Sequence, residues 1–182
     1  MTLLGEMMRP TWCEIDLGAL GRNFNVIRKR VKNSMVMPVI KADAYGHGIE
    51  KIGMHLERLG ADRLAVAYVE EGVVLREAGV TIPIHVMGGA IERQIPLFLD
   101  YDLIFTAPSI DKLKQINAAA EARGQKAVVH LKIDTGMERI GVHHYNAESF
   151  LLASLNCESI IVEGVFSHFA RADETNLSSA LL

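Results

Sequence analysis

The chain alternates between short apolar segments and longer segments in which apolar residues recur at helical spacing. Leu20, Phe24 and Ile27 fall on one face of a helix that would run to about Val31, and Asp16 can cap its start. The short apolar segments predict strands, and the longer segments between them predict helices. The expected strands are 11–15, 34–41, 64–68, 83–87, 103–106, 127–133 and 160–166, and the other expected helices are 49–59, 69–78, 109–123 and 147–156.

This order of elements predicts an α/β fold. Strands separated by helices of this size favour parallel βα units. Either an open sheet or a (β/α)8 barrel satisfies the pattern, and periodicity alone does not separate the two. In both architectures ligands bind over the carboxyl ends of the strands. Functional residues are therefore expected where the predicted strands end.

Length and composition exclude several classes of protein. The chain has 182 residues, 49% of them hydrophobic, which is enough to bury the core of one domain. Its formal net charge of −3 comes without the basic stripe typical of nucleic-acid binding. The apolar runs are shorter than the ~20 residues of a membrane span, and the first residues lack a signal core, so we expect a cytoplasmic protein. Cys13 and Cys157 lie far apart without metal-ligand spacing, which predicts free thiols and no metal site.

The most specific chemical signal is Lys41. The expected strand 34–41 is apolar on both faces, as in a parallel sheet that is covered on both sides, and it ends on this lysine. The sequence from Lys41 reads Lys-Ala-Asp-Ala-Tyr-Gly-His-Gly, a turn punctuated by glycine. Partial removal from water favours the neutral amine of a lysine, and a neutral amine can bond to a carbonyl carbon.

Residues 41–48 resemble the cofactor-attachment signature of the alanine racemases, enzymes that use pyridoxal 5′-phosphate (PLP) to interconvert L-alanine and D-alanine. Residues 130–141 and 164–174 resemble two further motifs of the same family, and the three occur in the family's order. Together they extend over nearly the whole chain. The resemblance implies an N-terminal (β/α)8 TIM-type barrel, which in the family is followed by a mainly β second domain.

The chain is shorter than such a barrel, which typically needs ~250 residues. Counted from the strand 34–41, about six of the eight barrel strands can be placed, and residues 1–33 form a lead-in strand and helix. We therefore expect residues 1–182 to form a single, incomplete PLP-binding barrel domain, the N-terminal portion of a racemase without its β domain. An unclosed barrel leaves two unpaired edges, which predicts marginal stability or self-association.

The resemblance implies a role for each matching residue. Lys41 is expected to be the catalytic residue that attaches PLP and then moves the substrate α-proton on one face, while PLP acts as an electron sink. Tyr45 is expected to hydrogen-bond the cofactor phosphate, and His168 to pack at the cofactor. Arg139 is expected to contact the phenolic oxygen of PLP and the substrate carboxylate, a bidentate task suited to a guanidinium. The alternatives are a surface tyrosine, a structural histidine and a solvated arginine.

Lys132 is expected to point into the barrel, because it alternates with Leu131 and Ile133 along its strand. A cation inside a barrel is costly. In some members of the family the lysine at this place is carbamylated, which would give an anion able to hold Arg139. An unmodified ion pair is the alternative.

The second base cannot be placed in this sequence. In the family it is a tyrosine from the second domain of a partner subunit in a homodimer, so we expect little or no racemase activity from these 182 residues alone. The whole enzyme would supply D-alanine for cell-wall peptidoglycan, with alanine as its partner and neither nucleic acid nor membrane. Three alternatives stay open: a non-racemising PLP-binding homeostasis barrel, a broad-specificity amino-acid racemase, and a remnant that binds nothing.

Overall fold

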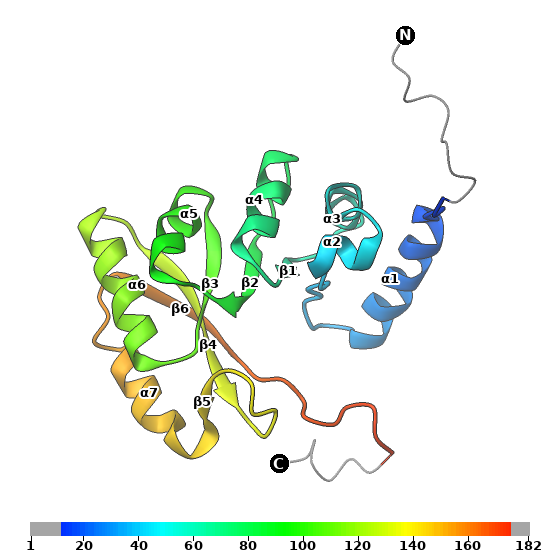
Figure 1. Ribbon diagram of the computed structural model, residues 1–182. Coiled ribbons are helices and arrows are strands. Elements are labelled where there is room, and N and C mark those ends of the chain that lie inside the picture. Colours follow the sequence, from blue (N-terminus) through cyan, green and yellow to red (C-terminus); the bar gives the residue numbers. More distant parts are fainter. Residues whose placement is uncertain (1–11, 176–182) are drawn as a thin grey trace.

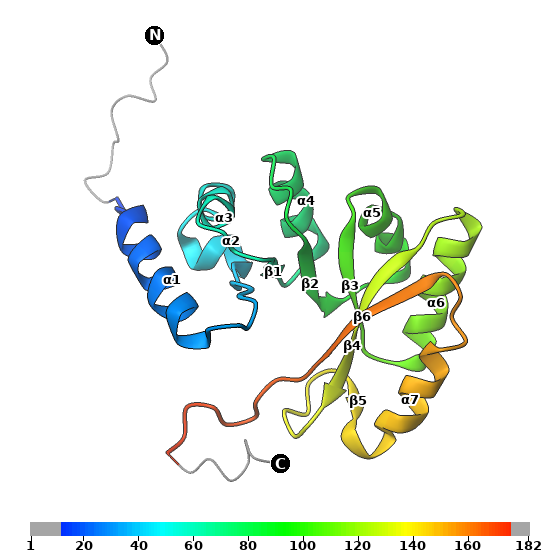
Figure 2. The ribbon, with the colours of Figure 1, turned by 180° about the vertical axis from the view of Figure 1, so that it is seen from behind.

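A computed structural model describes residues 12–175 and shows a parallel sheet with helices along one side (Figures 1 and 2). The neighbouring strands β1, β2, β3, β4 and β6 follow one another across the sheet, and every pair is parallel. The short β5 pairs with the last residues of β4. The strands are β1 Leu64–Val66, β2 Ile84–Gly89, β3 Leu103–Ala107, β4 Ala127–Asp134, β5 Val142–His143 and β6 Ile160–Phe166.

The helices confirm the expected alternation. Asp16 caps the first helix, since its Oδ1 accepts a hydrogen bond from the Ala19 N–H at 2.9 Å. Two short helices, α2 and α5, were not predicted, because one or two turns carry too little periodicity to be recognised. The helices are α1 Leu17–Val31, α2 Lys41–Gly46, α3 Ile49–Arg58, α4 Val69–Glu77, α5 Ile95–Asp100, α6 Ile110–Ala122 and α7 Ala147–Ser154, with single 3-10 turns at Glu92–Gln94 and His144–Asn146.

Two of the expected strands are wrong. In the segment 34–41 only Val39 forms a parallel bridge, to Ala65 of β1. Pro38 has no N–H to donate, and only its carbonyl contributes, accepting from the Ala65 N–H at 2.9 Å. The expected lead-in strand 11–15 has no regular secondary structure over residues 12–15, and Thr11 lies outside the described residues. An apolar segment becomes a strand only where a neighbour takes its backbone hydrogen bonds.

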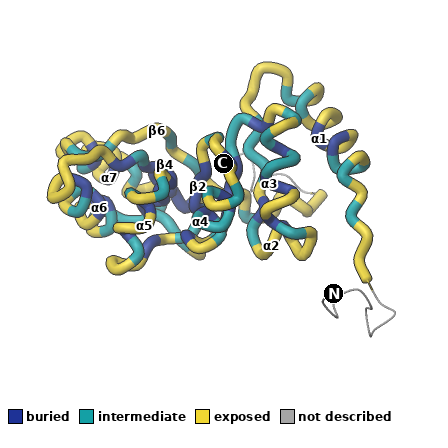
Figure 3. Tube along the Cα trace, turned by 90° about the horizontal axis from the view of Figure 1, so that it is seen from above, coloured by how far each residue is buried: buried dark blue, intermediate teal, exposed yellow. Residues whose placement is uncertain are grey.

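The two faces of the sheet differ in chemistry. Side chains alternate along each strand, and the outer face packs its apolar residues against the helices in one core. Figure 3 shows these buried positions along the strands and on the sheet-facing sides of the helices. The opposite face, called the inner face below, carries four of the five buried polar residues: His85, Thr106, Lys132 and Asp134.

The sheet does not close within residues 12–175. Its path runs from the bridge at Val39 to β6, and these two ends are not paired with each other. The expectation of a partial barrel is thereby confirmed. None of the described helices is long and apolar enough to cross a bilayer.

Candidate active site

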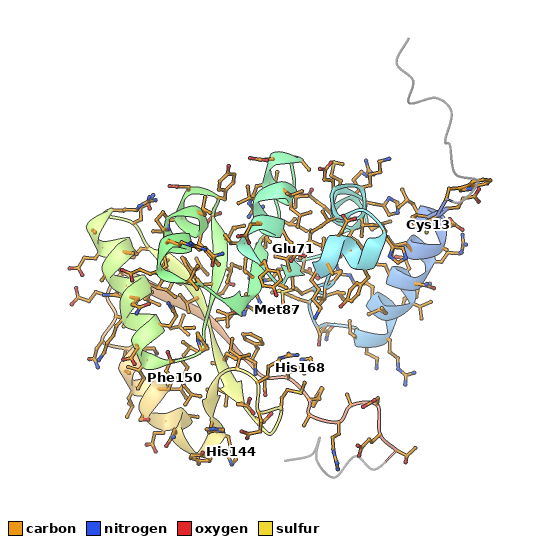
Figure 4. All side chains as sticks on the ribbon, viewed as in Figure 1. Cys13, Glu71, Met87, His144, Phe150 and His168 are labelled. Atoms are coloured by element: carbon orange, nitrogen blue, oxygen red, sulfur yellow. The ribbon has the colours of Figure 1, made fainter. Side chains whose placement is uncertain are left out.

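The predicted site residues follow the carboxyl ends of parallel strands. Lys41 begins α2 directly after the segment that bridges to β1, Arg139 lies in the loop after β4, and His168 comes two residues after β6. Figure 4 shows His168 on the segment that leaves the sheet after β6. Because parallel strands end at the same edge of a sheet, these side chains share one rim.

The positive charges of three neighbouring residues affect His168. The pKa of His168 is lowered from its usual 6.5, first by partial burial and then by the positive charges of Arg139, Lys132 and Lys41. Three cations from separate segments therefore lie close enough to influence one imidazole. His168 is then neutral at pH 7, so it does not add a fourth positive charge to Arg139, Lys132 and Lys41, which are suited to bind anions.

Lys132 points to the inner face, as predicted, with only 3% of its surface exposed. Its Nζ donates to the Ile133 carbonyl at 2.8 Å and lies 5.4 Å from the centroid of the Phe166 ring. Burial is the main cause that lowers the Lys132 pKa, and Arg139 adds to it while Asp134 opposes it. A lowered pKa favours the neutral amine, the form in which the nitrogen of a lysine can be modified chemically.

Asp134, which the sequence analysis missed, organises the loop that carries Arg139. Its carboxylate accepts hydrogen bonds from the N–H groups of Gly136 at 2.8 Å, Glu138 at 3.2 Å and Arg139 at 3.2 Å. These bonds, with that of Gly136 the strongest, lower the Asp134 pKa to about 2. The signal in the sequence was an acid at the end of a strand, two residues before a glycine.

Asp134 also belongs to a group of side chains that could hold a cation. Ligand atoms of Asp134, Glu138 and His143 lie within 4.8 Å of one another. Three of the roughly four acceptor positions of the Asp134 carboxylate already bind backbone N–H groups. The Asp134 carboxylate therefore has little capacity left for a metal ion, and we assign it to the loop.

The turn after Lys41 has an unusual backbone. The four residues Ala42 to Tyr45 have φ between 52° and 57°, so α2 contains a left-handed turn. Such a turn costs roughly 1–2 kcal/mol for each residue that is not glycine. Lys41 is half-buried at its start. Within the turn, the Ala44 N–H donates to the Ile40 carbonyl at 2.9 Å.

Tyr45 lies in α2, four residues after Lys41 in the same left-handed turn. Its side chain is 61% exposed and borders a cavity of about 670 Å³ between α1 and the segment 36–47. Phe24, Ile40 and Ile52 give this cavity a mostly apolar wall. The structure thus places Lys41, Arg139 and Lys132 near enough to His168 to lower its pKa, and it places Tyr45 on the turn that begins at Lys41.

A second group of polar residues on the inner face was also missed. Arg63 pairs with Glu163 through two guanidinium nitrogens, one of them 3.0 Å from Oε1, and His130 Nε2 lies 3.0 Å from Oε2 of the same carboxylate. His85 Nε2 lies 2.9 Å from the Thr106 hydroxyl, which itself donates to the Val86 carbonyl. His85 and His130 fall within the expected strands 83–87 and 127–133, where nothing in the sequence marks them as members of a polar group.

Comparisons with known proteins agree with this geometry. The chain matches the description "Alanine racemase, N-terminal domain" over residues 15–181. It is 44% identical over 174 residues to an alanine racemase of Halothermothrix orenii, a match that covers 95% of this chain and 46% of that protein. The chain therefore spans about half the length of the curated relatives it matches.

Solved structures share its fold. An alanine racemase from Clostridium difficile 630 in complex with cycloserine superposes with a TM-score of 0.92 at 36% identity, covering 97% of this chain and 49% of that one. A histidine racemase from Leuconostoc mesenteroides superposes with a TM-score of 0.84 at 25% identity, over 90% and 44% of the two chains. From the match over residues 15–181 and this shared fold it follows that the chain belongs to the family of alanine racemase N-terminal domains.

Proposed function

We propose that this chain is the cofactor-attachment portion of a PLP-dependent alanine racemase. The observation that carries the proposal is the half-buried Lys41 on the same rim as Arg139 and His168, where the charges of Lys41 and Arg139 both lower the His168 pKa. The relatives named alanine racemase support the reaction and alanine as the substrate. Supply of D-alanine for peptidoglycan by a cytoplasmic homodimer belongs to the same proposal.

The residues of the rim fit PLP. The cofactor carries an aldehyde, which reacts with an amine, together with an anionic phosphate and a phenolic oxygen, which attract cations. Lys41 would attach it, and Arg139 would orient the phenolic oxygen and the substrate carboxylate. When bound, PLP supplies the electron sink for the carbanion that forms at the substrate α-carbon.

The chain's own groups would handle the protons. The Lys41 amine would move the proton on one face of the substrate α-carbon, removing it in one direction of the reaction and delivering it in the other, while a group on the opposite face does the reverse. His168, neutral at pH 7 because its pKa is lowered, would hydrogen-bond at the site without adding charge. Lys132 would hold Arg139 if carbamylated, since it would then be an anion, and Tyr45 would bind the phosphate through its hydroxyl. The acid/base group for the opposite face would come from the second domain of a partner subunit.

Titration with PLP, borohydride reduction and peptide mapping test the attachment site. We expect a saturable pyridoxyl label on the peptide that contains Lys41, and no such label in Lys41→Arg. Lys51→Arg, which removes an exposed lysine of α3, is the matched control and should label as the unaltered chain does. Label spread over several lysines, or retained in Lys41→Arg, would contradict the proposal.

The second candidate is a broad-specificity amino-acid racemase, which the similarity to a histidine racemase supports. An amino acid that accepts the cofactor from Lys41 lowers the label that borohydride fixes on that lysine. L-alanine, L-serine and L-histidine can be compared at equal concentrations. Loss of label with alanine alone favours the alanine racemase, and equal loss with all three favours the broad enzyme.

A further inference from the structure

We propose that Glu71 is the positioning residue for Lys41. The proposal rests on the proposed function of Lys41, although its main readout does not require the cofactor. Glu71 lies in the first turn of α4, and Figure 4 shows it between α4 and α2. Its carboxylate joins the backbone of the Lys41 turn to the loop that follows β1.

The contacts of the two carboxylate oxygens are divided between these segments. Oε1 accepts a hydrogen bond from the Ala42 N–H at 2.5 Å. Oε2 accepts from the Ala67 N–H at 2.8 Å and from the Tyr68 N–H at 3.0 Å. One half-buried side chain therefore binds three backbone donors that belong to two separate segments.

The contact to Ala42 reaches Lys41 through a rigid unit. The peptide between Lys41 and Ala42 is planar, and its plane contains the Lys41 Cα and carbonyl as well as the Ala42 N–H. Fixing this N–H therefore fixes the direction in which the backbone leaves the Lys41 Cα. Lys41 itself holds a long, flexible side chain, so a fixed origin limits the positions that its amine can reach.

The turn needs such a tether because its backbone is unfavourable. Ala42 begins the left-handed stretch, with φ of 53° and ψ of 53°, and the next three residues continue it. Residues held in sparsely populated backbone regions persist only when their surroundings over-determine them. The Asp43 carboxylate holds the other end, where its Oδ1 accepts from the Ile49 N–H at 2.8 Å. Glu71 is the corresponding anchor at the Lys41 end.

Helix capping explains only part of this arrangement. A glutamate in the first turn of a helix commonly reaches back to the N–H before the helix, as Glu71 does to Tyr68. Capping of α4 does not require a bond to Ala42, which precedes Glu71 by 29 residues. The other carboxylate oxygen, Oε1, therefore has a role outside α4.

Amide hydrogen exchange at Ala42, together with PLP labelling of Lys41, tests the tether in the full chain. In Glu71→Gln one oxygen becomes an NH2 group, so the side chain can no longer accept at both segments. We expect exchange at Ala42 to rise about tenfold and the label on Lys41 at sub-saturating PLP to fall about tenfold. Glu70→Gln removes the same charge from the same turn, at an exposed side chain that accepts only from Gln94 at 3.1 Å, and should change neither readout.

Glu71→Asp separates a tether from a simple charge effect. Aspartate keeps the negative charge but is one methylene shorter, so it should fail to span both segments and should resemble Glu71→Gln. Full labelling of Lys41 in Glu71→Asp, or an unchanged Ala42 exchange rate in Glu71→Gln, would overturn the proposal. Faster exchange confined to Ala67 and Tyr68 would do the same, because Glu71 would then only cap α4.

The two proposals fail differently. If Lys41 takes up no label in the unaltered chain, the proposed function is wrong, while the Ala42 exchange still reports on the tether. If Lys41 is labelled equally in the unaltered chain and in Glu71→Gln, the proposed function stands and Glu71 has no positioning role. Thermal unfolding of each variant is the control for loss of the whole fold. Unchanged melting temperatures would mean that faster exchange at Ala42 is a local effect.

Discussion

The outer and inner faces of the sheet are built from the same strands but follow different rules. On the outer face, Val129 and Phe105 are buried among apolar helix residues in one continuous core. On the inner face, the neighbouring positions His130 and Thr106 are polar, and they contact other polar side chains. The outer face stabilises the fold by excluding water. The inner face depends on hydrogen-bonded pairs of polar side chains, although Nδ1 of the buried His85 has no hydrogen-bond partner among the described residues.

This difference separates the packing of the fold from the proposed site. Apolar packing on the outer face holds the strands and helices in place without regard to chemistry. The inner face and the rim at the ends of its strands carry Lys132, Asp134 and the loop of Arg139. Substitutions on the outer face should therefore reduce stability alone, whereas those on the inner face should also change pH and charge dependence.

The largest effect is expected on the outer face. Phe105 is 1% exposed and stacks on Phe98 with ring centroids 4.2 Å apart. Phe105→Ala should lower the free energy of unfolding by about 3–5 kcal/mol, because it removes a large apolar side chain and leaves a cavity. Urea unfolding measures this loss.

Two adjacent valines of β4 provide the matched control. Val129 is fully buried on the outer face, and Val128 is half-buried on the inner face. The same change to alanine should cost about 2 kcal/mol at Val129 and less than about 1 kcal/mol at Val128. Equal losses at the two positions would mean that the faces do not differ in packing.

The outer face is the part that the sequence predicted well. The expected strands 127–133 and 103–106, predicted as short apolar segments, agree with β4 and β3 within one residue, because burial against helices favours apolar residues there. The segment 34–41 was wrongly predicted to be a strand, because its pairing depends on contacts with distant residues. It is equally apolar, but it has Pro38 in its middle and pairs only through the single bridge at Val39.

Long-range contacts explain what the sequence did not reveal about the site. The left-handed turn consists of Ala-Asp-Ala-Tyr, none of which requires that backbone, and its anchor Glu71 lies 29 residues from Ala42. The pair of Arg63 and Glu163 spans 100 residues. Lys41, Arg139 and His168 were predicted because each lies in a recognisable motif at or after the end of an expected strand, whereas Glu71, Arg63 and Glu163 lie outside these motifs.

The second prediction concerns the buried His85 of the inner face. Burial, followed by the charges of His130 and Arg63, lowers its pKa to about 3 from the usual 6.5, with Glu163 opposing. The unfolded chain therefore binds more protons than the folded chain between these values, and stability falls as the pH decreases through that window. The slope contributed by His85 should approach about 1.4 kcal/mol per pH unit.

His85→Leu should remove this slope. Unfolding free energies measured between pH 7 and pH 4 should fall less steeply in the variant than in the unaltered chain. His144→Leu, at an exposed histidine outside the sheet, should leave the steep fall in place. An unchanged slope in His85→Leu would mean that another group causes the loss of stability at low pH.

A much smaller effect than that of Phe105→Ala is expected where the inner face meets solvent. The Glu163 side chain is 33% exposed and the Arg63 side chain 19%, and hydrogen bonds from Arg63 are the main cause that lowers the Glu163 pKa. Glu163→Gln keeps the shape of the side chain and one acceptor oxygen, so it should cost only about 1 kcal/mol.

A double-mutant cycle of Glu163→Gln with Arg63→Met, at low and high salt, measures the interaction of the pair itself. A coupling free energy of about 0.5–1 kcal/mol that weakens in salt would show that charge contributes to the inner face at its edge. Additive losses would mean that Arg63 acts through its packing alone. In that case the inner face would depend on its buried pairs, such as His85 with Thr106, and its solvent-facing pairs would resemble ordinary surface contacts.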